Sequence, residues 1–157
     1  MSSFAVISEF TRLALTVLVL VLGAAAEELL PKFLGVGFPV LLVTVPLLAP
    51  RCTRTEGLAF AAAAGALEEA LSSLPPMSGV SFFLALAALV RRFGLPGVLS
   101  GFAHPVYQVW LSVWCVRIGG GVFGRILLAF PIGFLTAAAV GAAINWPCRM
   151  AALNEQG

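Results

Sequence analysis

The organisation of this chain follows from one stretch of sequence, Glu56-Gly57-Leu-Ala-Phe-Ala-Ala-Ala-Ala-Gly65-Ala-Leu-Glu68-Glu69-Ala-Leu-Ser-Ser-Leu-Pro75-Pro76-Met-Ser-Gly79. It combines a long apolar run, a row of small residues and two adjacent carboxyl groups. An ionisable side chain inside a membrane span costs roughly 2.5 to 3.5 kcal/mol or more on insertion scales. The pair Glu68 and Glu69 therefore needs a structural or chemical reason.

Composition indicates an integral membrane protein. Of the 157 residues, 61% are hydrophobic and 10% are charged, and the mean hydropathy is +1.05, whereas an average soluble domain has about 25% charged residues. A span needs about 20 apolar residues, so a single domain over 1–157 has room for five or six helices. Long Leu, Ala and Val runs without alternation favour helices over a closed barrel. The formal charge of +2 argues against nucleic-acid binding.

We expect an all-α bundle of about six transmembrane helices, separated by prolines, glycines and charges. Pro39 is well placed to begin the second helix and Pro46 should kink it, so this segment should be short or bent and face the bundle interior. Proline and glycine predict turns at 75–79 and 94–97, and Gly119–Gly121 separates the last two helices. The expected spans are 8–26, 35–50, 57–74, 78–92, 97–117 and 123–146.

The first segment has two interpretations. Glu27, Glu28 and Lys32 mark a polar boundary, which favours a span that ends at about Ala26. A positive residue at Arg12, ten apolar residues and a small-residue stretch also fit a cleaved secretory signal peptide. Against cleavage stands Glu9 in the region that is positively charged in signal peptides.

Orientation follows from the lysines and arginines of the connecting loops. With six spans, one side of the membrane holds six of these charges and the other side holds three, so we expect both termini in the cytoplasm. The six are Arg12, Arg51, Arg54, Arg91, Arg92 and Arg149, and the three are Lys32, Arg117 and Arg125.

The helical periodicity of 57–74 separates its two acids. Phe60, Leu67, Leu71 and Leu74 fall in one sector, which predicts a lipid face, and Gly65, Glu69 and Ser72 lie opposite. Glu69 should therefore point into the bundle, with Glu68 on a flank where it can reach a neighbouring helix. Successive residues do not share a face, so a catalytic pair made of these two alone is disfavoured.

Small residues recur at four-residue spacing in two of the expected spans, the pattern that lets helix backbones approach closely in lipid. We interpret both series as helix-packing surfaces. They are Gly57, Ala61 and Gly65 in the third span, and Gly133, Ala137 and Gly141 in the sixth.

The span 97–117 carries the remaining polar chemistry. His104 and Gln108 share one face, and Tyr107 lies on an adjoining face with two tryptophans. At a rise of about 1.5 Å per residue, Glu69 is closer in depth to Tyr107 or Gln108 than to His104. We expect Glu69 to be a buried, hydrogen-bonded structural group rather than a proton relay or a catalytic residue.

An intramembrane enzyme is a weaker interpretation. The run Glu68-Glu69-Ala-Leu-Ser-Ser73 lacks the arginine of the EExxxR pattern found in intramembrane metalloproteases that process prenylated proteins. The chain has one histidine, and a tightly held metal needs about three protein ligands. Its cysteines have no metal spacing and suit apolar packing. We therefore expect no catalytic residues, metal or cofactor.

The order of features over residues 35–93 resembles the bacterial rod shape-determining protein family MreD. A proline precedes an apolar run (Pro39-Val-Leu-Leu-Val), and a short basic loop leads to a helix entered at Glu56-Gly57. The segment Gly65-Ala-Leu-Glu68-Glu69 is similar to the family's GLLxD motif, and a proline-glycine turn and an apolar helix follow. Glu69 stands where the family usually has aspartate, with Glu68 beside it, and the turn is somewhat longer.

This resemblance implies a non-enzymatic inner-membrane subunit of the cell-elongation machinery that acts in peptidoglycan synthesis. The implied partners are an MreC-like single-span periplasmic protein and, beyond it, RodA, a penicillin-binding transpeptidase and MreB. The family's fold is similar to that of the substrate-binding subunits of energy-coupling-factor vitamin transporters, which is the alternative function. An intramembrane enzyme is the second alternative. The candidate buried or partner-assembly residues are Glu69, Glu68, Gly65, His104, Tyr107 and Gln108.

Overall fold

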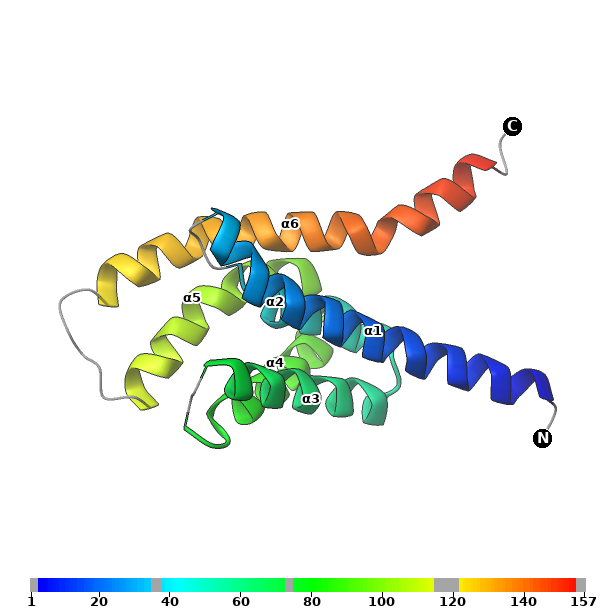
Figure 1. Ribbon diagram of the computed structural model, residues 1–157, viewed down its shortest axis with the longest axis horizontal. Helices are drawn as coiled ribbons and strands as arrows, with labels where there is room; N and C mark the ends of the chain where they lie inside the picture. Colours follow the sequence, from blue (N-terminus) through cyan, green and yellow to red (C-terminus); the bar gives the residue numbers. More distant parts are fainter. Residues whose placement is uncertain (1–2, 35–37, 73–74, 115–121, 155–157) are drawn as a thin grey trace.

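The computed structural model describes residues 3–34, 38–72, 75–114 and 122–154, and the regular elements within these ranges are all helical. This confirms the all-α class and the six helices expected from the sequence. Figure 1 shows the first turn of α1 and the last turn of α6 at the same end of the molecule. The elements are α1 (Ser3–Leu34), α2 (Val40–Leu48), the 3-10 turn η1 (Ala49–Arg51), α3 (Arg54–Ser72), α4 (Ser78–Phe93), α5 (Pro96–Trp114) and α6 (Val122–Asn154).

The short helix α2 is the centre of the fold. It contacts each of the other five α-helices, and its residues from Leu41 to Pro46 are buried. The helix begins directly after Pro39, contains Pro46 and gives way to η1 after nine residues. The prediction of a short segment in the interior is confirmed. At about 1.5 Å per residue, α2 is about 14 Å long, less than half of a hydrocarbon core about 30 Å thick.

Arg91 closes the far end of this central segment. It lies in the last turn of α4, and its guanidinium donates to the carbonyl oxygens of Ala49, Cys52 and Thr53. The last carbonyl groups of a helix have no partner within it, and a cation suits the negative end of the helix dipole. Arg91 thereby adds a charged partner at Ala49, the C-cap of α2, and joins α4 to the segment that leads into α3.

The helix α1 corrects one sequence prediction. The first helix was expected to end at about Ala26, but α1 continues through Glu27 and Glu28 and contains Pro31 before it ends at Leu34. The polar residues mark the end of an apolar run, whereas the helix itself continues because glutamate and leucine are good helix formers. Both acids are thus carried on a helix rather than in a loop.

The two predicted turns within the described residues are present. After α3, Ser78 donates from its backbone N–H and its Oγ to the carbonyl oxygen of Pro75, at 3.2 and 2.6 Å. Met77 takes a positive φ of 67°, a conformation that is uncommon for residues other than glycine. Gly94 ends α4 at φ 65°, and Pro96 begins α5. The separator predicted at Gly119–Gly121 lies outside the described residues.

Close packing of small residues holds two pairs of helices together. A Cβ placed on Gly65 would lie 2.7 to 2.9 Å from backbone atoms of Gly79 and Val80, and one on Gly133 would lie 2.6 Å from the carbonyl oxygen of Gly101. Both predicted packing surfaces are therefore confirmed at these positions. Gly141 is different, because a Cβ there would meet no atom within 4 Å, so the second surface does not extend that far.

The predicted lipid face of α3 is wrong in part. Phe60 is 4% exposed and belongs to the core, and Leu67 packs against the core, whereas Leu71 is exposed as expected. Ser72, predicted inside, is exposed. The buried face is the stripe that holds Gly57, Phe60, Ala61, Ala64 and Gly65. Small residues determine which face of α3 is buried, because they permit close approach of the neighbouring helices. The buried face therefore lies about a quarter turn from the side opposite the leucines, which the sequence had indicated.

One helical stretch in the described ranges, Phe123–Asn145 of α6, is long and apolar enough to cross a membrane, while Val40–Arg51 is a shorter apolar segment. In that stretch of α6, 17% of the window is buried, so most of its apolar surface faces outward. Its length and composition are compatible with a membrane location.

Replacement of Gly65 tests the close approach of α3 and α4. Gly65→Ala should lower the thermal unfolding midpoint of the protein purified in detergent, because overpacking typically costs about 1 to 3 kcal/mol while alanine gains at most about 1 kcal/mol in helix propensity. The matched control is Gly141→Ala, which meets open space and should leave the midpoint unchanged or raised. An equal response of the two variants would contradict the packing described for α3.

Candidate functional site

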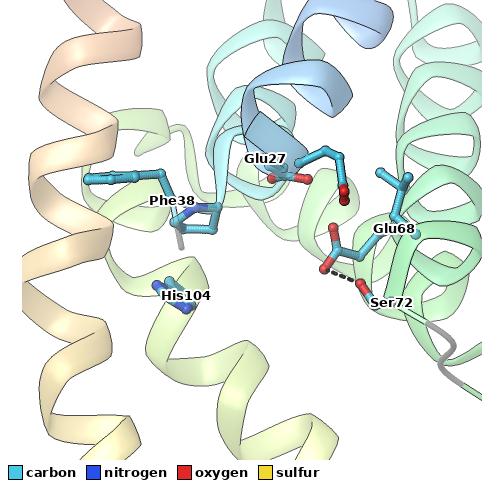
Figure 2. A pocket seen from close by; sticks show the side chains of 8 residues that line it. Glu27, Phe38, Glu68, Ser72 and His104 are labelled. Carbon is cyan, nitrogen blue, oxygen red and sulfur yellow. Dashed lines mark hydrogen bonds between the residues drawn. The ribbon is translucent and has the colours of Figure 1, made fainter. Parts of the chain in front are cut away.

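A pocket of about 230 Å³ lies where α1, the start of α2, α3 and α5 meet. Its acids lie between α1 and α3, and His104 of α5 and Phe38 lie on the other side (Figure 2). Glu27 lies near the end of α1, Ser72 is the last residue of α3 and His104 lies near the middle of α5. The lining residues are Glu27, Glu28, Phe38, Pro39, Glu68, Leu71, Ser72 and His104.

Glu27 connects the pocket to the central helix. Its Oε1 accepts a hydrogen bond of 2.7 Å from the backbone N–H of Leu41, in the first turn of α2. The N-cap residue of α2 is Pro39, which makes no capping hydrogen bond with its side chain. Because the first N–H groups of a helix lack partners within it, and because the helix dipole favours an anion there, Glu27 supplies the cap that the local sequence lacks.

Glu68 lies across the pocket from α1. Its Oε1 accepts a hydrogen bond of 3.3 Å from Ser72 Oγ, one turn later on α3. The carboxyl groups of Glu27 and Glu68 are close enough to interact electrostatically, although they come from positions 41 residues apart in the chain. The two carboxyl groups are hydrogen-bonded to each other, so they share a proton across the pocket. Two acids therefore face each other in a partly enclosed space.

His104 reaches the pocket because α5 and α6 pack closely. A Cβ on Gly133 would lie 3.2 Å from the His104 Cβ, so the glycine leaves room for the histidine at this level. The Nε2 of His104 is 3.2 Å from Gln108 Nε2. Its Nδ1 is buried without a hydrogen-bond partner among the described residues. The predicted neighbours His104 and Gln108 thus contact each other, and His104 shares the pocket with Glu68.

Glu69 lies outside the pocket and has a different role. It accepts hydrogen bonds from the backbone N–H groups of Met77 at 3.1 Å and Val80 at 2.9 Å, at the beginning of α4. The acid thereby closes the turn between α3 and α4, as Glu27 closes the start of α2. Glu69 is hydrogen-bonded and structural, as expected, but its partners are these backbone groups rather than the Tyr107 or Gln108 side chains.

Tyr107 belongs to an aromatic cluster in the core. It is 3% exposed, and its ring centroid is 4.9 Å from that of Phe82 and 6.1 Å from that of Phe83. Trp110, one turn further along α5, donates from Nε1 to the carbonyl oxygen of Ser78 at 3.0 Å. Offset and edge-on aromatic contacts of this kind stabilise packing. Tyr107 therefore joins α4 to α5 and does not line the pocket.

Glu68 reaches a neighbouring helix, α1, and Glu69 is hydrogen-bonded, as expected, but the directions assigned to the two acids of α3 differ from those in the structure. Glu68, expected on a flank, lines the interior pocket, and Glu69, expected to point inward, turns toward α4. The sequence interpretation also missed Glu27 and Phe38, because Glu27 was read as the end of a span. One signal could have revealed Glu27: it is followed by Glu28, Leu29 and Leu30, a run that favours a continuing helix.

The described residues contain no group of three or more His, Cys, Asp or Glu side chains arranged to hold a metal ion. Comparison with protein-family models, with curated proteins and with solved structures finds no match. Fold and site together define an all-helical protein with an apolar outer helix and an acidic pocket between α1, α3 and α5.

The two acids of α3 should differ in their effect on stability. Glu69→Leu removes the acceptor for two backbone N–H groups and should lower the free energy of unfolding by about 2 kcal/mol or more, since hydrogen bonds to charged groups contribute about 1.5 to 3 kcal/mol each. Glu68→Leu removes a carboxyl group that faces another acid and should cost less. Thermal unfolding in detergent gives the ranking, with Glu69→Gln as the control that retains an acceptor. A larger loss for Glu68→Leu would refute it.

Proposed function

We propose that this chain is a multi-pass protein of a bacterial inner membrane that acts as an MreD-like, non-enzymatic subunit of the cell-elongation complex. Support for the membrane location comes from large apolar side chains on the outside of three helices. A soluble protein rarely exposes many large apolar side chains together, whereas lipid solvates them. Among the most exposed are Val21 of α1 at 57%, Val113 of α5 at 69%, and Phe123, Leu128 and Leu135 of α6 at 72, 64 and 66%.

Helix lengths support a bundle in which most helices cross the bilayer. At about 1.5 Å per residue, the 19 residues of α3 and of α5 extend about 28 Å, close to the hydrocarbon thickness of about 30 Å. The 32 residues of α1 and the 33 of α6 exceed it and would project into the headgroups or tilt. The shorter α2 is covered by protein on all sides, the condition under which a broken helix is stable at membrane depth.

Both termini are placed in the cytoplasm in this proposal. The first turn of α1 and the last turn of α6 share one end of the molecule (Figure 1). Arg51 at the end of η1 donates to Asn145 Oδ1 on α6 at 2.8 Å, and Arg91 contacts the same η1 region, so two of the six arginines assigned to the cytoplasmic side lie close together.

Cysteine accessibility tests this topology. In a background with Cys52, Cys115 and Cys148 replaced by serine, Met77→Cys should react with a membrane-impermeant maleimide added to intact spheroplasts. Arg92→Cys should react only after the membrane is permeabilised, because it lies at the opposite end of α4. Labelling of both positions from outside, or of neither before lysis, would contradict the proposed orientation.

The observation that carries the functional proposal is the way in which α3 and α4 form one clamped hairpin. The three parts of the MreD-like pattern all contribute to this hairpin. Gly57 leaves room for Ala49 and Arg91 to approach closely. Gly65 contacts the Gly79 backbone, and Glu69 caps α4. A motif whose residues all serve packing suits an assembly subunit, because such a protein has to present a rigid surface to partners. We place an MreC-like single-span protein first among these, followed by RodA, a penicillin-binding transpeptidase and MreB.

A cell-shape assay tests the function. Depletion of the protein should round the cells, and the tagged protein should co-purify with an MreC-like partner. Glu69→Leu should restore rods less well than Glu68→Leu, with immunoblots of membrane fractions to compare protein levels. Normal rods after deletion, or equal complementation by both variants at equal abundance, would contradict the proposal.

A further inference from the structure

We infer that the surface formed by Arg51, Arg54 and Arg92 binds phospholipids of net negative charge through their phosphate groups. We call this surface the arginine end. The inference rests on the proposed membrane location, and it is independent of the proposed role in cell elongation.

Charge is separated along the hairpin of α3 and α4. Arg54 begins α3 and Arg92 lies in the last turn of α4, whereas Glu68 and Glu69 lie at the other end of the hairpin, near the turn between the two helices. Arg51 ends η1, which leads into α3. Charges of one sign that are collected on one surface attract the opposite charge. The arginine end is therefore suited to an anionic partner.

The arginines of this end differ in how their donors are used. Arg91 serves the fold, because its guanidinium donates to three backbone carbonyl oxygens and so joins the last turn of α4 to the segment that holds Arg51 and Arg54. Arg51 is exposed and donates from Nη2 to Asn145 Oδ1 at 2.8 Å. Arg54 and Arg92 are exposed as well. A guanidinium has five N–H donors in a plane that matches a phosphate group, so the exposed arginines keep donors for an anion.

Acidic residues do little to neutralise this surface. The segments 49–57 and 89–97 contain one acid, Glu56, and its Oε2 accepts the backbone N–H of Thr53 at 2.8 Å. Thr53 Oγ1 accepts in turn from the Glu56 N–H at 3.4 Å, so the two residues cap the start of α3. The chain thus supplies the anion at this helix end, and three exposed arginines against one acid leave an excess of positive charge.

Apolar side chains beside the arginines identify the anion as a lipid. Leu89, Phe93, Leu95 and Val98 lie close to Arg92 in the chain and are 45 to 60% exposed. A soluble acidic protein or free phosphate would leave most of this apolar surface in water. A phospholipid covers it with acyl chains and brings its phosphate to the guanidinium group, because arginine side chains reach from apolar surroundings to the headgroups.

Arg125 provides an internal comparison. It is exposed near the start of α6, and it lies 20 positions before Asn145, which contacts Arg51. At about 1.5 Å per residue this separation is about 30 Å along the helix, close to the thickness of the hydrocarbon core. Arg125 is therefore an exposed arginine on the membrane surface opposite the arginine end.

Lipid-dependent thermal unfolding tests the inference. The full-length protein in dodecyl maltoside is heated with dioleoyl phosphatidylglycerol, or with dioleoyl phosphatidylcholine, whose choline group neutralises the same phosphate. Phosphatidylglycerol should raise the unfolding midpoint by several degrees more, with a saturable concentration dependence, because a ligand that binds the folded state stabilises it. The difference should shrink at high sodium chloride concentration, since salt screens exposed charges. Sodium phosphate at the lipid concentration should have no effect.

Matched variants locate the effect. A variant that combines Arg51→Gln, Arg54→Gln and Arg92→Gln should lose most of the difference between the two lipids. Replacement of the same three arginines by lysine keeps the charge and should retain part of the difference, which separates charge from structural damage. Arg125→Gln removes an exposed arginine from the other surface and should respond like the wild type.

A measurement on the unmodified protein covers variants that fail to fold. Wild-type protein purified from an equimolar mixture of the two lipids in detergent should retain more phosphatidylglycerol than phosphatidylcholine, as measured by mass spectrometry of the extracted lipids.

The outcomes separate this inference from the membrane location on which it rests. Equal midpoint shifts with the two lipids, equal retention, or an undiminished difference in the triple glutamine variant would overturn the inference and leave the membrane location standing. A shift of the same size with a polyglutamate peptide would overturn it in favour of an acidic protein partner. A protein that stays monodisperse without detergent and responds to neither lipid would overturn the membrane location as well.

Discussion

The rest of this structure depends on how the two ends of α2 are satisfied. A helix of nine residues at the centre of an apolar protein leaves N–H groups at one end and carbonyl groups at the other that have no partner within the helix. Glu27 of α1 accepts at the first end, and Arg91 of α4 donates at the second. Because these side chains come from different helices, the caps also fix α1 and α4 around the centre.

Capping of helix ends by side chains of other helices explains most of the charged groups in the interior of the protein. Glu69 holds the start of α4 as Glu27 holds the start of α2, and Arg91 is placed by its carbonyl partners. Each of these groups replaces hydration with backbone hydrogen bonds, which makes a charge tolerable in apolar surroundings. Glu68 and His104 are not used in this way. They line the pocket instead, where Glu68 meets Glu27 and Ser72 and where His104 contacts Gln108.

The contrast between Gly65 and Phe60 shows how far local patterns can be trusted. The four-residue spacing of small residues correctly indicated a close helix contact, because only glycine fits where two backbones touch, as at Gly65 and Gly79. The assignment of large apolar residues to lipid failed for Phe60, which is buried. In a bilayer, large apolar side chains are stable both in the protein core and against lipid. Hydrophobicity alone therefore does not distinguish the buried face of a helix from its lipid face.

The sequence by itself determined the helical class, the number of helices, the turns at 75–79 and 94–97 and the short central segment between two prolines. These features follow from local properties of the chain, which are the length of the apolar runs, the N–H group that proline lacks and the wide range of backbone conformations open to glycine. Only the tertiary structure decided that Glu27 meets Glu68 and that Glu69 caps α4, and it placed His104 in the same pocket. Those contacts join residues far apart in the chain or depend on the rotation of a helix by about a quarter turn, which is set by the packing of all neighbouring helices together.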